Sequence, residues 1–169
     1  MASGASRRPS FWGLLLVVVV LDRITKVLAE RALGAGEAIS LVGETAQLRL
    51  VYNPGAAFGL HLGAYSRWIF MGIAIVAVVF LYRMWRETDL PDRLRLYALG
   101  FVAGGAAGNL IDRFISPRGV VDFIDVGIGS ARWPTFNVAD IAVSCGAVAL
   151  ALSLWREDAR RAAAAVPPA

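Results

Sequence analysis

Apolar residues occupy four long blocks of the chain, and most charged residues lie between the blocks. Each block approaches the roughly 20 residues with which an α-helix crosses a hydrocarbon core of about 30 Å. Tryptophan lies at or near the block ends, as in the aromatic belts of membrane proteins. The pattern predicts four membrane-spanning helices, at about residues 11–29, 68–85, 95–112 and 134–155. Pro134 suits the first turn of the last helix.

The loop between the first two blocks has a period of two. Leu48, Leu50 and Tyr52 occupy alternate positions after a turn at Gly43-Glu44, which is typical of β-strands. The predicted fold class is an all-α membrane protein with four transmembrane helices and a small extracytoplasmic β-sheet. We expect residues 1–159 to form one membrane domain, with β character in the outer loop 36–62. The Ala/Pro-rich residues 160–169 are expected to be a disordered tail.

The composition agrees with a membrane protein and limits the chemistry. Of the 169 residues, 57% are apolar and 18% are charged, and the mean hydropathy is +0.60. These values exclude a disordered chain and an ordinary cytosolic protein. One Cys and one His allow no internal disulfide and no His/Cys metal site. We therefore expect no metal and no cofactor, and we expect Cys145 to be a small packing residue.

Arginine is distributed unevenly between the two sides of the predicted membrane domain. The termini and the loop between the second and third blocks carry nine arginines, whereas the two longer loops carry five. The positive-inside rule then places both termini in the cytoplasm and the longer loops, about 32–66 and 114–132, outside. Because the arginines flank apolar blocks and form no stripe, we expect contact with membrane lipid and no nucleic-acid binding.

Several polar side chains lie within the predicted spans, where ionisable groups usually serve a function. Asp22 and Lys26 are four residues apart and are expected to pair on one helix face. Asn109 and Arg113 share a face of the third span, where they either support an active site or form part of a packing surface with an Asp112–Arg113 pair. Glycines at every fourth position, Gly100, Gly104 and Gly108, predict close approach of another helix.

Two aspartates suggest proton-transfer chemistry. Asp122 lies in an apolar run of the second outer loop, and Asp140 lies about two turns into the fourth span, three residues after Asn137. If they meet, one carboxylate activates water and the other protonates the leaving group, as in aspartic proteases. The alternative is a salt bridge from one of them to Arg113 or Arg132, with the other in an ion pathway.

At this point the sequence resembles a known family, the bacterial lipoprotein signal peptidases, also called signal peptidase II. Five motifs occur in the order of the family and cover residues 22 to 140. They are Asp22-Arg23-Ile24-Thr25-Lys26, Tyr52-Asn53-Pro54-Gly55-Ala56-Ala57-Phe58-Gly59, Gly108-Asn109-Leu110-Ile111-Asp112-Arg113, Val120-Val121-Asp122-Phe123 and Phe136-Asn137-Val138-Ala139-Asp140. Each motif alone is weak, whereas five in order are specific.

The resemblance implies an aspartic endopeptidase of the bacterial inner (cytoplasmic) membrane, acting near its outer face. Its substrate is a prolipoprotein whose lipobox Cys carries diacylglycerol, and it cuts just before that Cys. The resemblance implies these roles: catalytic Asp122 and Asp140; supporting or substrate-binding Asn53, Asn109, Arg113 and Asn137; structural Asp22, Lys26 and Asp112. It also implies inhibition by the cyclic peptide globomycin, and we expect a monomer.

Three other functions stay open at the level of sequence. An ion or solute transporter would use Asp22, Asp112 and Asp140 as a relay. A structural membrane subunit would use the glycine face to bind a partner helix. A different intramembrane aspartic protease would not need a lipidated Cys. Under the signal peptidase hypothesis, the Gly/Ala-rich stretch Gly55–Leu62 is expected to form a lid over the peptide.

Overall fold

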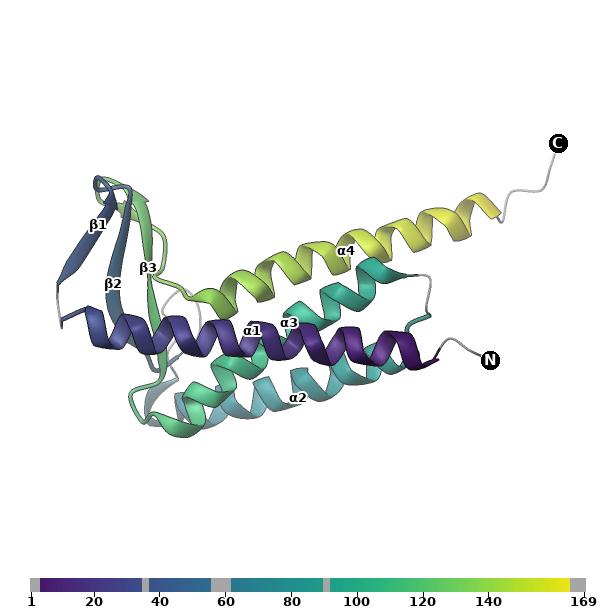
Figure 1. The fold of residues 1–169 in the computed structure, drawn as a ribbon, viewed down its shortest axis with the longest axis horizontal. Helices are drawn as coiled ribbons and strands as arrows, with labels where there is room; N and C mark the ends of the chain where they lie inside the picture. The colour runs from purple at the N-terminus through teal and green to yellow at the C-terminus, as the bar shows by residue number, and fades with distance from the viewer. Residues whose placement is uncertain (1–3, 35–36, 56–61, 90–91, 165–169) are drawn as a thin grey trace.

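The computed structural model describes residues 4–34, 37–55, 62–89 and 92–164. Its long helices are α1 (Gly4–Ala32), α2 (Ser66–Glu87), α3 (Arg93–Ile115) and α4 (Val138–Ala164). The strands are β1 (Ala38–Val42), β2 (Ala46–Asn53), β3 (Val120–Ile128) and β4 (Ala131–Arg132), and a short 3-10 turn, η2 (Gly63–Tyr65), precedes α2. The helices run along one long axis, with the sheet at one end and the start of α1 and the end of α4 at the other (Figure 1).

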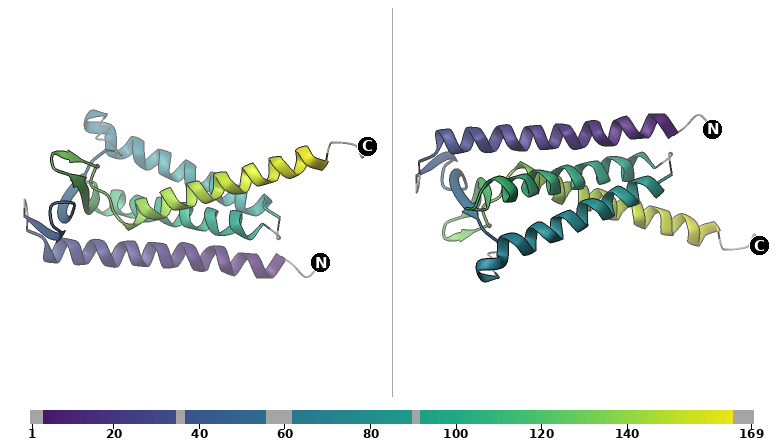
Figure 2. Two further views of the ribbon diagram at one scale, coloured as in Figure 1. Left: turned by 90° about the horizontal axis from the view of Figure 1, so that it is seen from above. Right: turned by 90° about the horizontal axis from the view of Figure 1, so that it is seen from below.

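Helix α3 forms the centre of the bundle and packs against α1, α2 and α4. Figure 2 shows α1 and α2 on opposite sides of α3. Glycines permit the close contacts, since a Cβ added at Gly104 would lie 2.8 Å from the Val18 Cβ of α1. On the α4 side, a Cβ added at Gly105 would lie 2.3 Å from the Ala139 carbonyl oxygen. The prediction that another helix approaches the glycine face closely is therefore confirmed, and that helix is α1.

The strands form one antiparallel sheet in the order β1-β2-β3-β4. The predicted hairpin within 36–62 is confirmed, because β1 and β2 pair across a turn at Gly43, whose φ is +51°. Strand β3 was not predicted. It pairs with β2 so that Val51 lies opposite Asp122, which places Asn53 and Asp122 at the same edge. Most of β3 is buried on both faces, so its sequence lacks the period-two signal.

Two predicted boundaries in the last helix are wrong. Pro134 precedes α4, because the Phe136 backbone pairs with Ile124 of β3 and keeps this segment extended. Asp140 consequently lies in the first turn of α4 and not two turns into it. The predicted tail 160–169 is helical up to Ala164, where alanines and the Glu157–Arg161 ion pair favour helix; residues 165–169 lie outside the described part.

The outer surface of the bundle is apolar and its interior holds charge. Three described helices, α2, α3 and α4, are long and apolar enough to cross a membrane. Helix α1 is not among them, since Asp22, Arg23 and Lys26 interrupt its apolar block. Large apolar side chains such as Val76 and Val148 face outward, whereas Asp22 and Lys26 are buried. This distribution is that of a protein solvated by lipid.

Candidate active site

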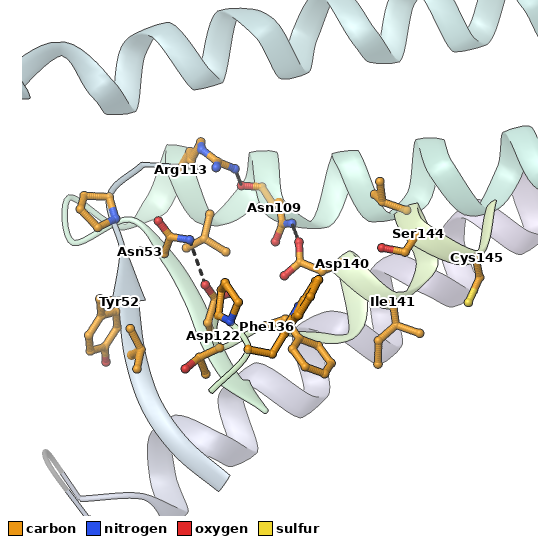
Figure 3. A pocket seen from close by; sticks show the side chains of 17 residues that line it. Tyr52, Asn53, Asn109, Arg113, Asp122, Phe136, Asp140, Ile141, Ser144 and Cys145 are labelled. Carbon is orange, nitrogen blue, oxygen red and sulfur yellow. Dashed lines mark hydrogen bonds between the residues drawn. The ribbon is translucent and has the colours of Figure 1, made fainter. Parts of the chain in front are cut away.

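A cavity of about 690 Å³ opens where the sheet meets the helices. Its walls come from the end of β2, the start of β3, the segment 133–136, the last turns of α3 and the first turns of α4. Most of the lining is apolar, with a small polar group at its centre. Figure 3 shows the labelled members of that group, Asn53, Asn109, Arg113, Asp122 and Asp140, around one space. The structure thus brings together five of the six residues predicted as catalytic or supporting, and Asn137 lies directly behind them.

Asp122 projects from β3 and is 2% exposed. Its carboxylate accepts hydrogen bonds from Asn53 Nδ2 at 3.1 Å and from Asn137 Nδ2 at 2.7 Å. Burial raises the pKa of Asp122 from 3.8 to about 7, and the negative charge of Asp140 contributes to the rise. Asp122 therefore holds a proton at neutral pH more readily than an ordinary carboxyl group.

Asp140 is fixed by the start of α4. Its carboxylate accepts the Asn137 backbone N–H at 3.1 Å, and the Asn137 side chain accepts the Asp140 backbone N–H at 3.0 Å. This reciprocal arrangement is a capping box, with Asn137 as the N-cap. Asn109 Nδ2 donates to the other Asp140 oxygen at 2.8 Å. The local sequence of the helix start therefore positions the Asp140 side chain.

Asn137 is the residue that touches both aspartates. It is fully buried, and its amide NH₂ faces Asp122 Oδ1, the Val121 carbonyl and Asn109 Oδ1. Since its amide oxygen is used by Asp140, its NH₂ must point to Asp122. Asn137 thereby hydrogen-bonds to both carboxylates, through its side-chain NH₂ to Asp122 and through its backbone N–H to Asp140.

Arg113 contacts backbone rather than either aspartate. Its guanidinium donates to the Gly55 carbonyl at 2.9 Å and to the Asn109 carbonyl at 3.1 Å. Arg132 pairs with Asp125 at 3.0 Å. Over the described residues, neither Asp122 nor Asp140 forms an ion pair, so the alternative of a salt bridge to Arg113 or Arg132 is wrong.

The three residues expected to be structural lie beneath the cavity. Lys26 pairs with Asp22 and with Asp112, each at 2.8 Å, which confirms the predicted Asp22–Lys26 pair. Asp112 also pairs with Arg23 at 3.3 Å. The alternative of an Asp112–Arg113 pair is therefore wrong, because the Asp112 carboxylate pairs with Arg23 and Lys26 of α1.

Sequence reasoning missed part of the cavity wall. Tyr52, Phe136, Ser144 and Cys145 line it. Cys145 is exposed, so the expectation of a packing residue is wrong. The helical period could have predicted Ser144 as a lining residue, because it lies four residues after Asp140 on the same helix face. Residues 56–61 of the predicted lid Gly55–Leu62 lie outside the described residues.

Two solved bacterial membrane enzymes, both determined by the in meso method, share this fold. One aligns with a TM-score of 0.81 at 25% identity, covering 90% of this chain and 92% of that chain. The other aligns with a TM-score of 0.76 at 26% identity, covering 87% and 93%. The chain thus has the fold of these bacterial membrane enzymes, with a polar cavity where the sheet meets the helices.

Sequence comparison identifies the family. The family described as signal peptidase (SPase) II matches residues 14–156. The lipoprotein signal peptidase of Cupriavidus necator is 40% identical over 160 residues, which are 92% of this chain and 89% of that protein. The lipoprotein signal peptidase of Hydrogenovibrio crunogenus is 42% identical over 144 residues, or 83% of this chain and 81% of that protein. The chain belongs to the signal peptidase II family.

Proposed function

We propose that this peptidase removes the signal peptide from diacylglyceryl-modified prolipoproteins by aspartic chemistry, with Asp122 and Asp140 as the catalytic pair. The observation that carries the proposal is the attachment of both carboxylates to Asn137 inside one cavity. A pair of carboxylates in contact with one substrate space can divide the roles of acid and base. The membership in the signal peptidase II family supplies the substrate class.

The surroundings of the two aspartates favour different roles. Asp122, whose pKa is raised to about 7, is the general acid. Asp140 accepts hydrogen bonds from two N–H donors at the start of α4 and is the general base. Asp140 takes a proton from water while the water oxygen bonds to the scissile carbonyl carbon. The C–N bond then breaks as Asp122 protonates the amine of the lipidated Cys, and the proton on Asp140 returns to Asp122.

The other cavity residues suit substrate binding. Asn53 and Arg113 have polar groups at the cavity wall beside the dyad, where an extended peptide backbone needs donors. The apolar wall formed by residues such as Ile141 and Phe136 suits acyl chains. A globomycin-type cyclic peptide would bind in the same space. Asn137 acts from behind the dyad, since it contacts both carboxylates while fully buried.

We also propose a membrane topology for the chain. All four helices cross the bacterial cytoplasmic membrane, both termini are cytoplasmic, and residues 1–159 form one membrane domain that acts as a monomer. Helix α1 carries three charged residues in its apolar block, but Asp22, Arg23 and Lys26 form ion pairs. These pairs lower the cost of placing the charges in a membrane-spanning helix. The sheet and the cavity then lie near the outer face, where diacylglyceryl chains can remain in lipid.

Cleavage of a diacylglyceryl-modified prolipoprotein peptide by the purified protein in detergent tests the proposal. Asp122→Asn and Asp140→Asn are each expected to abolish cleavage while thermal unfolding stays close to that of wild type. Asp125→Asn is the matched control, because Asp125 is a buried carboxylate of the same strand that faces Arg132 and does not line the cavity. Full activity of either catalytic-site variant would remove that residue from the mechanism. Equal cleavage of the unlipidated peptide would favour a different aspartic protease, and flux without cleavage would favour a transporter.

A further inference from the structure

A buried ammonium group lies directly beneath the two aspartates. Lys26 of α1 is 0% exposed, and its Nζ contacts Asp22, Asp112 and Asn109 Oδ1, the last at 2.9 Å. Three acceptors satisfy the three N–H bonds of the ammonium group. None of these acceptors belongs to the catalytic pair. Asn109 contacts Asp140 directly, and Asp22 and Asp112 each contact the backbone of the residue that precedes a catalytic aspartate.

The first route from Lys26 leads through Asn109. The Asn109 amide oxygen accepts from Lys26, so its NH₂ is directed to Asp140 at 2.8 Å. If this amide were reversed, its NH₂ would face the ammonium group and its oxygen would face the carboxylate, and both contacts would be repulsive. The positive charge of Lys26, together with the Asn137 NH₂ that donates to the same Asn109 oxygen at 3.1 Å, thus directs a hydrogen-bond donor to Asp140.

The other two routes lead through the carboxylates that Lys26 holds. Asp22 accepts the backbone N–H of Ala139 at 2.9 Å, and Ala139 directly precedes Asp140. Asp112 accepts the backbone N–H of Val121 at 3.2 Å, and Val121 directly precedes Asp122. The two partners of Lys26 therefore each hold the backbone next to one catalytic aspartate.

A purely stabilising role does not require this arrangement. Burying a lysine is costly, and well-packed apolar residues often give equal or greater stability than a buried ion pair. The four charges Asp22, Arg23, Lys26 and Asp112 balance, but Arg23 contacts only Asp112 of this group and its side chain is 41% exposed. Lys26 joins α1 to α3 through Asp112 and Asn109, and it also pairs with Asp22, which accepts the Ala139 N–H of α4.

We propose that Lys26 is a positioning residue for catalysis. It fixes the orientation of the Asn109 amide and, through Asp22 and Asp112, the position of the backbone beside both aspartates. The inference rests on the proposed function. It assigns to Lys26 an effect on the rate of the chemical step, while contacts of the substrate with the cavity wall stay as they are. Misplacement of catalytic groups by about 1 Å is enough to lower a rate by about 100-fold.

A double-mutant cycle of Lys26→Met and Asn109→Ala tests this role with the lipidated peptide. Lys26→Met is expected to lower kcat by about 10- to 100-fold with little change in KM. Because one of the three routes from Lys26 runs through Asn109, the double variant should lose less than the product of the two single losses. Arg23→Met is the matched control, since it removes one cation from the same group without touching Asn109, and its kcat should stay within about threefold of wild type.

A charge-balanced variant separates positioning from folding. Asp22→Asn combined with Lys26→Met removes one charge of each sign and should recover the thermal stability that Lys26→Met loses, but not kcat. If Lys26→Met does not fold, the double-mutant cycle is repeated with Asp22→Asn present in all four proteins, so that the charge is balanced in the Lys26→Met variants. Recovery of kcat in the charge-balanced variant, or multiplicative losses in the cycle, would overturn the positioning role alone. Absence of cleavage by the wild-type protein would overturn the proposed function as well.

Discussion

Four carboxylates lie where the sheet meets the helices, and they form two pairs with different partners. Asp22 and Asp112 are held by the cations Lys26 and Arg23. Asp122 and Asp140 are held by the neutral amides of asparagines and by backbone N–H groups. Removing one member of a buried ion pair leaves a charge without compensation. A neutral donor, in contrast, allows the carboxylate beside it to gain or lose a proton.

Under the proposed function, this difference predicts which substitutions change mainly the stability of the protein and which change mainly its catalytic rate. The ion-paired layer, made of Asp22, Asp112, Lys26 and Arg23, joins α1 to α3 and to the backbone beside Asp122 and Asp140. The amide-held layer lines the cavity, where a substrate can approach. With the exception of Lys26, a residue of the first layer is therefore expected to affect mainly folding when it is replaced, and a residue of the second layer mainly the reaction.

The same substitution in each layer gives the largest contrast. Asp112→Asn should lower the free energy of unfolding by about 3–5 kcal/mol, because Lys26 and Arg23 lose a shared partner. Asp122→Asn should leave it unchanged or raise it at pH 7, since Asn resembles a protonated carboxyl group and places no charge in the buried site. Thermal and denaturant unfolding in detergent measure both values. Equal losses would mean that the two layers do not differ as their partners suggest.

Asn137→Ala should damage the amide-held layer at its centre. Both carboxylates lose a contact, and α4 loses its N-cap. We expect kcat to fall by about 100- to 1,000-fold, similar to the loss of one oxyanion-hole donor, and stability to fall by about 1 kcal/mol. Asn53→Ala is the matched comparison, since it removes one donor from Asp122 alone and should cost less in kcat. A smaller loss for Asn137→Ala than for Asn53→Ala would contradict the shared role of Asn137.

The sequence predicted those contacts whose two residues lie close together in the chain, and it did not predict contacts between distant segments. The Asp22–Lys26 pair was predictable because both residues lie on one helix face. The five motifs, through resemblance, pointed to residues that line the cavity, and spacing alone left an aspartate pair as one of two alternatives. The contact of Lys26 with Asn109 and the pairing of β3 with β2 join segments far apart in the chain. Local periodicity carries no signal for such contacts, and the buried run of β3 does not alternate.

The pH dependence tests the acid role of Asp122. Its pKa is raised to about 7, so cleavage should fall about tenfold per pH unit above that value as the acid loses its proton. Initial rates from pH 5 to 9 measure this limb, with Asp125→Asn as the control that keeps it. Between 3.8 and about 7 the folded protein holds a proton on Asp122 that the unfolded chain has released. The free energy of unfolding therefore falls as pH rises through this window, and Asp122→Asn should remove that part of the slope.

Two glycines of α3 provide a smaller test of the same contrast, since each faces one layer. A Cβ at Gly108 would lie 2.6 Å from Asp22 Oδ2, and a Cβ at Gly105 would lie 2.3 Å from the carbonyl oxygen of Ala139, next to Asp140. Each change to Ala should cost about 1–3 kcal/mol by overpacking. The ratio of kcat loss to stability loss should be larger for Gly105→Ala, because it moves the start of α4. Gly72→Ala of α2 meets no atom within 4 Å and should leave both unfolding and cleavage close to wild type. Equal ratios for the two α3 variants would show that α1 and α4 shift together, so that the layers respond as one unit.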